Sequence, residues 1–305
     1  MQDTDGYRLD KHQVRVAFDR SAALYDGAAV LQREVGQRLL ERLDVIKIQP
    51  RTVLDVGSGT GFCSEALLHR YPKANVVALD LAHGMLRHHR GRQSWWRRRS
   101  LWPWRARQSF VCADAETLPL ADASVDLIVS NLTLQWCVDL DRTFGEFRRV
   151  LAPGGLLLFT TFGPDTLKEL RESWSRADGY THVHAFIDMH DIGDALVRSQ
   201  FDTPVMDMEY LTVTYPDVTT LMRDLKHIGA HNASGGRPRG LTGRGRLRAV
   251  SEAYEAHRRD GVLPATHEVV YGHAWAPTQP LAQRRTDGVA TVSLEQVRAG
   301  MGQRR

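Results

Sequence analysis

The sequence predicts an α/β protein built on a doubly wound, mostly parallel β-sheet, and two observations carry this prediction. First, short segments that are apolar at nearly every position alternate with helical patterns between residues 52 and 161. Strands of this kind are buried on both faces, as in a parallel sheet that helices cover on each side. Second, the strand at 52–56 runs directly into the glycine-rich loop 57–61, and a helical pattern follows. This order is typical of α/β folds that bind ligands where parallel strands end.

The elements of the first half follow from local patterns. Between residues 10 and 46, apolar residues at helical spacing predict two helices. Short apolar runs predict strands at 52–56, 75–80, 110–112, 125–130 and 156–161. Helical spacing between these strands predicts helices at 62–71, 82–89 and 140–151.

The second half has a different rhythm, because helices now come in pairs. Helical patterns lie at 164–176, 189–199, 217–228 and 246–259. Strands are predicted at 205–213 and 268–274, and we expect these two to pair at an edge of the sheet. The run 232–246 is mostly Gly, Arg, Ser and Pro, which predicts a mobile loop.

These patterns predict one main domain in four segments. We expect an N-terminal helical lid at 1–50 and a ligand-binding core at 51–163, which includes a basic insertion at about 90–107. Residues 164–276 are expected to complete the same domain with helical insertions and antiparallel strands on the substrate side. The polar, glycine-bearing tail at 277–305 is expected to be poorly ordered.

The composition excludes several classes of protein. Of the 305 residues, 42% are hydrophobic and 25% are charged, which is typical of a globular protein with a sizeable core. No apolar run approaches the roughly 18 residues of a membrane span, and the start lacks a signal-peptide pattern, so we expect a cytoplasmic protein without membrane contact. Cys63, Cys112 and Cys137 have no metal-binding spacing, which predicts buried free thiols and no metal site.

The basic character of the chain comes from one segment. Residues 87–107 hold eight arginines, four of the seven tryptophans and no acidic residue. Without these arginines, 32 basic and 36 acidic residues would give a net charge of −4 instead of +4. Nucleic-acid binding along the whole surface is therefore a poor prediction.

The glycine loop carries the strongest functional signal. Gly57, Gly59 and Gly61 alternate after a strand, which lets a ligand approach the backbone where no Cβ intrudes. A dinucleotide-binding loop would have a glycine or alanine at the sixth position, but Phe62 stands there. Asp55 places a carboxylate beside the loop, which disfavours a pyrophosphate and favours a ligand amino group.

Two further acids end the next strands. Asp80 lies 19 residues past Gly61, where a carboxylate can accept hydrogen bonds from both ribose hydroxyls. Asp114, followed by Ala115, ends the third strand, where it could accept from an adenine amino group. A ligand with an amine, a ribose and an adenine but no phosphate is S-adenosyl-L-methionine (SAM).

Four segments resemble successive motifs of the class I SAM-dependent methyltransferases: VLDVGSGTG, VVALDLAHGML, CADAETLPL and VDLIVSNLTLQW. The resemblance implies a Rossmann-like sheet of seven strands whose last strand is antiparallel. It also implies the cofactor-binding residues, which are Asp55, Gly57, Gly59 and Gly61 at the methionine end, Asp80 and Leu81 at the ribose, Asp114 and Ala115 at the adenine, and Asn131 after the fourth strand. Met85 is predicted to pack on the adenine, with a place in the helix core as an equal alternative.

A narrower resemblance covers most of residues 10–275. The segments AFDRSAALYDGAAVLQREVG, SNLTLQWCVDL and LMRDLKHIGAHNASGGR are similar to the malonyl-[acyl-carrier-protein] O-methyltransferase family of biotin synthesis. This implies methylation of the free carboxylate of a malonyl thioester, on acyl carrier protein or coenzyme A, to give the ester that primes pimeloyl synthesis. A carboxylate is ionised at neutral pH, so we expect no general base.

The acceptor-side residues are less distinct in the sequence. A site that selects a free carboxylate needs cations or hydrogen-bond donors, and the candidates are Arg223, Lys226, His231 and Arg237. Their alternative is a solvated helix face and loop. Tyr25 and Trp136 are predicted to be aromatic walls that position the acceptor near the sulfonium, with core packing as the alternative. Gln32 and Arg33 follow Tyr25 on the next helix of the expected lid.

The basic insertion departs from the family pattern. Arg97, Arg98, Arg99 and Trp102 could dock an acidic acyl carrier protein, and a surface insertion without a role is the equal alternative. Three other functions stay open from the sequence. These are methyl transfer to a quinone precursor or another small acid, modification of a protein partner by a methyltransferase-like protein, and non-catalytic regulation or nucleic-acid binding through the insertion.

Overall fold

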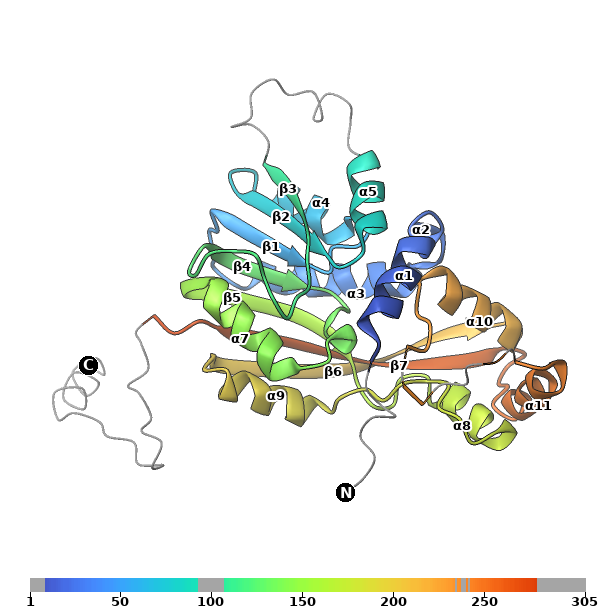
Figure 1. Cartoon of the computed structure of the whole chain (residues 1–305). Helices are drawn as coiled ribbons and strands as arrows, with labels where there is room; N and C mark the ends of the chain where they lie inside the picture. Colours follow the sequence, from blue (N-terminus) through green and yellow to red (C-terminus); the bar gives the residue numbers. More distant parts are fainter. Residues whose placement is uncertain (1–8, 93–106, 234, 237–239, 241, 279–305) are drawn as a thin grey trace, which may run out of the picture.

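A computed structural model describes residues 9–92, 107–233, 235–236, 240 and 242–278 of the chain. Within this part, a seven-stranded sheet has the order β3-β2-β1-β4-β5-β7-β6, with helices on both faces (Figure 1). The predicted doubly wound α/β fold is therefore confirmed. Most of the basic insertion, Arg237 and the segment 279–305 lie outside the described residues, so the predictions for them stay predictions.

The five strands of the first half are parallel. β1 pairs with β2 and β4, β2 with β3, and β4 with β5. Their bounds are β1 Thr52–Val56, β2 Asn75–Asp80, β3 Gln108–Cys112, β4 Val125–Ser130 and β5 Leu151–Phe162. Because all five strands run the same way, Asp80 and the residues after β1, β3 and β4 lie together at the C-terminal ends of these strands.

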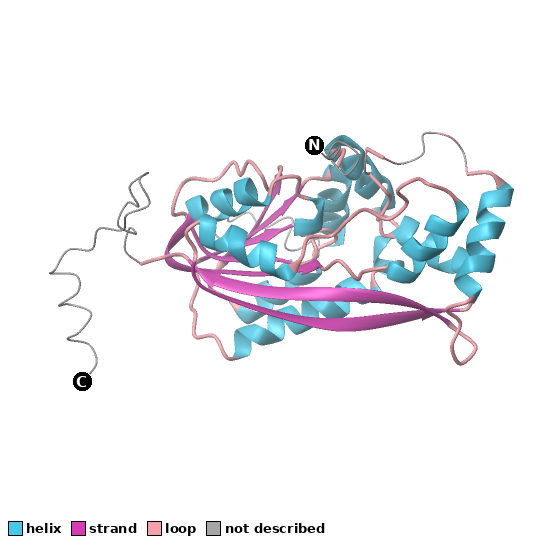
Figure 2. Cartoon of the chain, turned by 90° about the horizontal axis from the view of Figure 1, so that it is seen from below, coloured by secondary structure: helices cyan, strands magenta, loops and turns pink. Residues whose placement is uncertain are grey.

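The last two strands are antiparallel to their neighbours. β7 (Leu263–Trp275) pairs with β5 on one side and with β6 (Asp202–Tyr215) on the other. The predicted pairing of these two strands is confirmed, but the edge position belongs to β6, since β7 lies inside the sheet. Burial explains this, because nine of the 13 positions of β7 are buried, whereas β6 alternates between exposed and half-buried. Figure 2 shows both strands running along the molecule between layers of helices.

Two hydrophobic clusters cover the two faces of the sheet. On one face, Leu54 and Val56 of β1 pack with Phe144 and Phe147, and on the other face Val53 packs with Leu67. The helices of these layers are α3 Val30–Glu41, α4 Phe62–Arg70, α5 His83–Arg92, α7 Leu140–Val150 and α9 Met189–Arg198. Alternating residues of one strand thus enter opposite layers, as a sheet buried on both sides requires.

A third cluster joins the helices of the second half to the far ends of β6 and β7. It contains Trp174, Leu221, Tyr254 and Leu263, all buried. The helices are α8 Lys168–Ala177, α10 Val218–His227 and α11 Arg244–Glu255. The helix expected from residue 164 begins later, because Leu167 has a left-handed φ of 55° and its N–H bonds to the carbonyl of Thr266 instead.

The N-terminal segment forms three α-helices where the sequence predicted two. They are α1 Lys11–Ser21, α2 Tyr25–Ala28 and α3, and a 3-10 turn, η2 Arg42–Asp44, follows. Asp10 begins α1 because its carboxylate accepts a hydrogen bond from the Gln13 N–H at 3.2 Å. The break before α2 divides the predicted first helix and turns the chain over the sheet edge (Figure 1).

The described residues include no helix long and apolar enough to cross a membrane. Of the three cysteines, Cys63 and Cys137 are buried free thiols, as predicted, but Cys112 is exposed at the end of β3. The prediction for Cys112 was wrong because β3 is the edge strand of the sheet. In the part of the chain that the structure describes, no three His, Cys, Asp or Glu side chains lie together as metal ligands would.

Candidate active site

A cavity of about 660 Å³ lies where the parallel strands end, and we call it the strand-end cavity. Its walls include ten of the residues singled out in the sequence, which are Tyr25, Gly57, Gly59, Asp80, Leu81, Met85, Asp114, Ala115, Asn131 and Trp136. They come from β2, from the segments that follow β1, β3 and β4, and from helices α2 and α5. The fold thus brings together side chains that are more than 100 residues apart in the sequence.

The three glycines of the loop have different surroundings. Gly57 has a φ of 71°, and a Cβ there would lie 1.9 Å from Oγ1 of Thr133. Gly59 lines the cavity, and a Cβ there would meet no atom within 4 Å. Gly61 does not line the cavity; a Cβ there would lie 2.1 Å from Nε2 of His89. Of the three, Gly59 is therefore the one that opens space for a ligand.

Two of the predicted acids have different roles around this loop. Asp80 lines the cavity, and its carboxylate accepts hydrogen bonds from the N–H groups of Gly59 and Ala82, each at 2.8 Å. Burial raises the pKa of Asp80 to about 6, against the effect of these two donors. Asp55 is fully buried beneath the loop, where the Ser64 hydroxyl donates to it at 2.5 Å. Burial raises the pKa of Asp55 to about 7.

Asp114 meets a cation that the sequence analysis did not single out. Nζ of Lys11, on α1, lies 2.6 Å from Oδ1 of Asp114 and 2.7 Å from Oε1 of Glu116. Burial lowers the pKa of Lys11, but the two carboxylates outweigh it and leave this pKa above the usual value. Because Lys11 also lines the strand-end cavity, the first helix is tied to the acid predicted to bind adenine.

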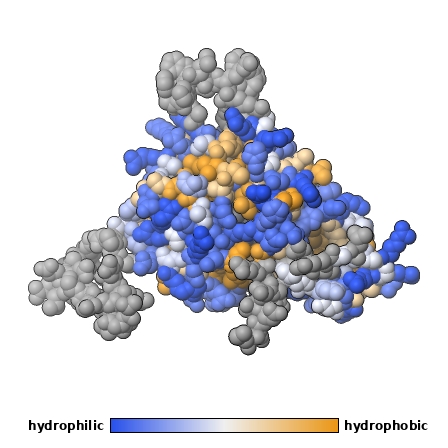
Figure 3. Space-filling view, in the orientation of Figure 1, coloured by the Kyte–Doolittle hydropathy of each residue, from blue (hydrophilic) through white to orange (hydrophobic). Residues whose placement is uncertain are grey.

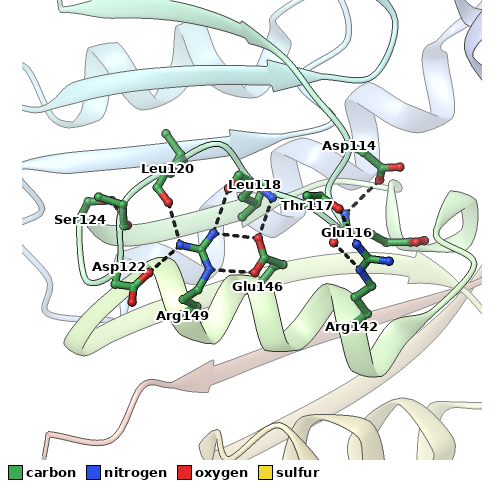
Figure 4. Close-up of polar contacts among 11 residues, drawn as sticks. Asp114, Glu116, Thr117, Leu118, Leu120, Asp122, Ser124, Arg142, Glu146 and Arg149 are labelled. Atoms are coloured by element: carbon green, nitrogen blue, oxygen red, sulfur yellow. Dashed lines mark hydrogen bonds and ion pairs between the residues drawn. The ribbon is translucent and has the colours of Figure 1, made fainter.

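The segment after Asp114 is held in place by α7, as Figure 4 shows. Nε of Arg142 donates to the carbonyl of Glu116 at 2.9 Å, and Arg149 donates to the carbonyls of Leu118 and Leu120. Glu146 completes the contact by accepting from the Leu118 N–H at 2.7 Å. Three polar side chains of α7 thus fix the backbone that presents Asp114 to the cavity.

The N-terminal helices cover the strand-end cavity. Phe18 and Tyr25 pack against Met85 on α5, and the Asp19 carboxylate accepts from the Gly84 N–H at 2.6 Å. The Asp26 carboxylate accepts from the Thr60 hydroxyl at 2.5 Å. Met85 is buried in the helix core and also lines the cavity, and its packing on the adenine stays a prediction.

A second cavity of about 1210 Å³ lies beside the first, and we call it the helix-side cavity. It is enclosed by α2, α3, α8, α10, β5, β6 and β7 and by the segment 182–186. Phe18, Tyr25, Leu132 and Trp136 line both cavities, so the two spaces meet at these four side chains. On the face that Figure 3 shows, apolar side chains gather near the middle, while polar ones occupy most of the margin.

Aromatic rings extend from the shared wall into the helix-side cavity. The Trp136 ring packs against Phe18, with ring centroids 5.3 Å apart, and against His184 at 5.1 Å. His184 in turn packs against Phe186 at 4.6 Å. Burial raises the pKa of Tyr25, so its hydroxyl stays protonated at neutral pH. The sequence predicted Tyr25 and Trp136 at this place, but not His184 or Phe186.

The predicted acceptor cations do not line the helix-side cavity. Arg223 and Lys226 are exposed on α10, whereas the same helix contributes Asp224, Leu225 and Ile228 to the wall. His231 is exposed after α10, and burial of its ring together with nearby Lys226 and Arg20 lowers its pKa. Arg223, Lys226 and His231 therefore lie at the surface beside the cavity, and their contact with an acceptor stays a prediction.

The residues of the strand-end cavity fit SAM as the bound cofactor. Gly59 leaves open space beside the loop, and Asp80 and Asp114 present carboxylates at neighbouring strand ends. Carboxylates suit the hydroxyl and amino donors of a ribose and an adenine. Asn131 also lines this cavity, and its amide joins α3 to β5 through the Gln32 carbonyl and the Thr160 hydroxyl.

Comparisons with known proteins agree with this geometry. The sequence model of the family described as methyltransferase domain matches residues 54–159. A malonyl-[acyl-carrier protein] O-methyltransferase of Methylovorus sp. (strain MP688) is 55% identical over 290 residues, covering 95% of this chain and 96% of the relative. Another, from Nitrosospira multiformis, is 56% identical over 281 residues, covering 88% of this chain and 90% of the relative.

A likeness among solved structures concerns the fold alone. The YcgJ protein of Bacillus subtilis has a TM-score of 0.56 and 16% identity, with 79% of this chain and 98% of that chain covered. Sequence relatives and cavity geometry together assign the cofactor as S-adenosyl-L-methionine. The chain belongs to the malonyl-[acyl-carrier protein] O-methyltransferase family, and it is an S-adenosyl-L-methionine-dependent O-methyltransferase with the Rossmann-like fold of class I.

Proposed function

We propose that this enzyme methylates the free carboxylate of a malonyl group carried as a thioester on acyl carrier protein. The observation that supports it most is the contact between the two cavities at Phe18, Tyr25, Leu132 and Trp136. A cofactor in one cavity and an acceptor in the other would meet at this wall. The names of relatives at 55% and 56% identity indicate which acceptor to expect.

The side chains at the wall suit methyl transfer to an anion. SAM supplies a methyl group on a positively charged sulfur, and transfer to a carboxylate oxygen leaves a neutral thioether and a neutral ester. Since a malonyl carboxylate is ionised at neutral pH, no residue has to remove a proton. Phe18, Tyr25 and Trp136 can position the two groups and exclude water, and their ring faces favour a nearby cation.

The cofactor would be held by residues of the strand-end cavity. Gly59 leaves room beside the loop, Asp80 is placed for the ribose hydroxyls, and Asp114 for the adenine amino group. Residues 1–50 would act as the lid, because Lys11, Asp19 and Asp26 each bond from the N-terminal helices to segments beside the cavity. Cofactor entry would require at least some of these bonds to open.

The carrier protein would dock outside the helix-side cavity. Exposed Arg223 and Lys226 offer positive charge next to His231, and an acidic carrier protein carries the complementary charge. The segment with Arg97, Arg98, Arg99 and Trp102 stays a second proposed docking element, and Arg237 a further acceptor-side cation. The predicted cytoplasmic location belongs to this proposal as well.

The test is a transfer assay with SAM labelled on its methyl group. We expect label on malonyl-acyl carrier protein, and none after the malonyl carboxylate has been blocked as an amide. Malonyl-coenzyme A in a parallel reaction shows whether the carrier protein is needed, through the ratio of the two kcat/KM values. Equal labelling of the blocked and free acceptors, or no labelling of either, would contradict the proposed function.

A further inference from the structure

We propose that His184 donates a hydrogen bond to the malonyl carboxylate and so selects a free acid over an ester. This rests on the proposed function and adds a specificity-determining residue to it. The observation behind it is a buried ring nitrogen without a hydrogen bond, on a residue that lines the helix-side cavity and a third cavity of about 790 Å³, next to the rings where the first two cavities meet.

The position of His184 fits such a contact. It lines the helix-side cavity and packs directly against Trp136, which also lines the strand-end cavity. Trp136 and Phe186 both pack against the imidazole, at centroid distances of 5.1 and 4.6 Å. The His184 side chain is therefore held in contact with Trp136, one of the residues at which the two cavities meet and the methyl group would be transferred.

The hydrogen bonding of His184 is incomplete. Its Nε2 atom is buried and has no hydrogen-bond partner in the described structure, although the residue is only 8% exposed. Buried polar atoms are nearly always paired in folded proteins, so an unpaired one at a cavity wall indicates a missing partner. Gln32, in the same cavity, also has an unpaired atom, but this is its acceptor oxygen Oε1, which cannot bind an anion.

The described walls of the helix-side cavity hold no permanent cation for the carboxylate. Among the residues that the structure describes, those lining the helix-side cavity include no lysine or arginine. His182 is already occupied, because its Nε2 lies 2.8 Å from Oδ1 of Asp178 and its ring stacks on Trp174. Gln135 is also engaged, with its amide nitrogen donating to the Leu132 carbonyl and its oxygen accepting from the Thr161 hydroxyl. Besides the hydroxyls of Tyr25 and Tyr215, which also line this cavity, His184 offers a donor in its neutral form.

A neutral donor suits this reaction better than a cation would. Burial, followed by the charge of Arg171, lowers the pKa of His184 to about 4, so the ring is uncharged at neutral pH. An uncharged N–H orients a carboxylate without neutralising it, and the anion keeps its attraction for a positively charged sulfur. An ester has lost that charge, so its hydrogen bond to the same N–H is weaker.

The test compares affinities for the acid and the ester in the intact enzyme. Binding of malonyl-acyl carrier protein and of its methyl ester is measured by calorimetry with S-adenosylhomocysteine present, so that no turnover occurs. We expect wild type to prefer the free acid. His184→Phe, which keeps a ring but removes the donor, should lose about 10- to 100-fold in affinity for the acid and little for the ester. S-adenosylhomocysteine itself should bind within 2-fold of wild type.

Two further variants separate binding from folding. His184→Gln retains a neutral donor and should restore part of the preference for the acid, and it replaces the Phe variant if that one fails to fold. His257→Phe is the matched control, because the Nε2 of His257 is also buried without a hydrogen bond, with Oε2 of Glu172 3.7 Å away, and His257 lines neither cavity. It should leave the preference unchanged.

Each outcome has one meaning. If wild type does not methylate malonyl-acyl carrier protein, the proposed function fails, whatever His184 does. If wild type is active and the folded variants of His184 keep its ratio of acid to ester affinity, this inference alone is overturned. Equal losses for acid and ester also overturn it, because they would place the contact on the thioester end of the acceptor.

Discussion

The two cavities differ in how they are built. The strand-end cavity takes its key side chains from the ends of β1, β2 and β4 and from the segment after β3. The helix-side cavity takes its own from short helices, from the segment 182–186 and from both antiparallel strands. A parallel sheet places its strand ends together whatever the sequence between them. The first site therefore follows from the topology, and the second depends on how helices pack.

The largest effect is expected at Gly57, where the glycine loop lies closest to the side chain of Thr133. Gly57→Ala adds a Cβ that would lie 1.9 Å from Thr133 Oγ1, at a left-handed φ of 71°. Strain and clash together should cost about 2–4 kcal/mol of folding free energy and abolish detectable SAM binding. Thermal unfolding and calorimetry measure the two effects.

Gly59→Ala is the matched control for that variant. Its Cβ would meet no protein atom, so the cost should be limited to the left-handed backbone, about 1–2 kcal/mol. SAM binding should still weaken, because the added methyl occupies the cavity. Equal loss of stability in the two variants would show that the close approach of Thr133 does not matter.

A smaller but more selective effect is expected at Asp80. Asp80→Ala removes the carboxylate that faces the strand-end cavity, and we expect the Kd for SAM to rise about 10- to 100-fold. The KM for the malonyl acceptor, measured at saturating SAM, should change less than 2-fold. Asp44→Ala, at an exposed ion pair with Arg70, serves as the control. A parallel change in both constants would mean that the two cavities are not separate sites.

The buried acid beneath the loop should appear in the pH dependence of stability. The folded-state pKa of Asp55, about 7, lies above the usual aspartate value of 3.8, so ionisation of Asp55 costs folding free energy. Asp55→Asn should therefore raise the Tm of the cofactor-free enzyme at pH 8. The gain should shrink as the pH falls from 7 and vanish near pH 4. A gain that grows toward low pH would have the wrong sign.

The smallest effect is expected at the exposed cations of α10. Arg223→Ala and Lys226→Ala should each raise the KM for malonyl-acyl carrier protein about 2- to 5-fold at low salt, and less at high salt. The KM for malonyl-coenzyme A should stay nearly constant. Arg248→Ala, also exposed but on α11, is the control. A large, salt-independent effect would place these cations in direct contact with the malonyl carboxylate, as the sequence had suggested.

The difference between the strand-end cavity and the helix-side cavity also explains which site residues the sequence could predict. Apolar runs located β1, β2 and β4 to the residue, and the ends of the strands placed Asp80 and Asp114 at the cavity, while Asn131 came from the family resemblance. The glycine-loop motif did not reveal that Asp55 and Gly61 face the protein interior. The spacing of residues in a loop does not show which of them face the ligand and which face the interior. Only packing against Ser64 and His89 distinguishes them.

The acceptor side was harder to predict. His184 lies in a segment without regular secondary structure, where no periodicity shows which side is buried. Arg223 and Lys226 were chosen for charge and spacing on one helix, but α10 turns other residues inward. Lys11 was missed because its partner Asp114 is 103 residues away in the sequence. The alternation of His182, His184 and Phe186 was the one available signal, since extended segments point alternate side chains the same way.

The interior place of β7 has a consequence for biosynthesis. Residues 52–162 contain the five described strands that pair with one another in parallel, so this portion can pair its strands while later residues are still inside the ribosome. One edge of β5 then stays unpaired until residues 263–275 emerge from the ribosome and pair with it as β7. An unpaired strand edge invites aggregation, and a nascent chain that stalls before this point would expose one. His267, on β7, would also be absent, so the helix-side cavity of a stalled chain would lack part of its wall.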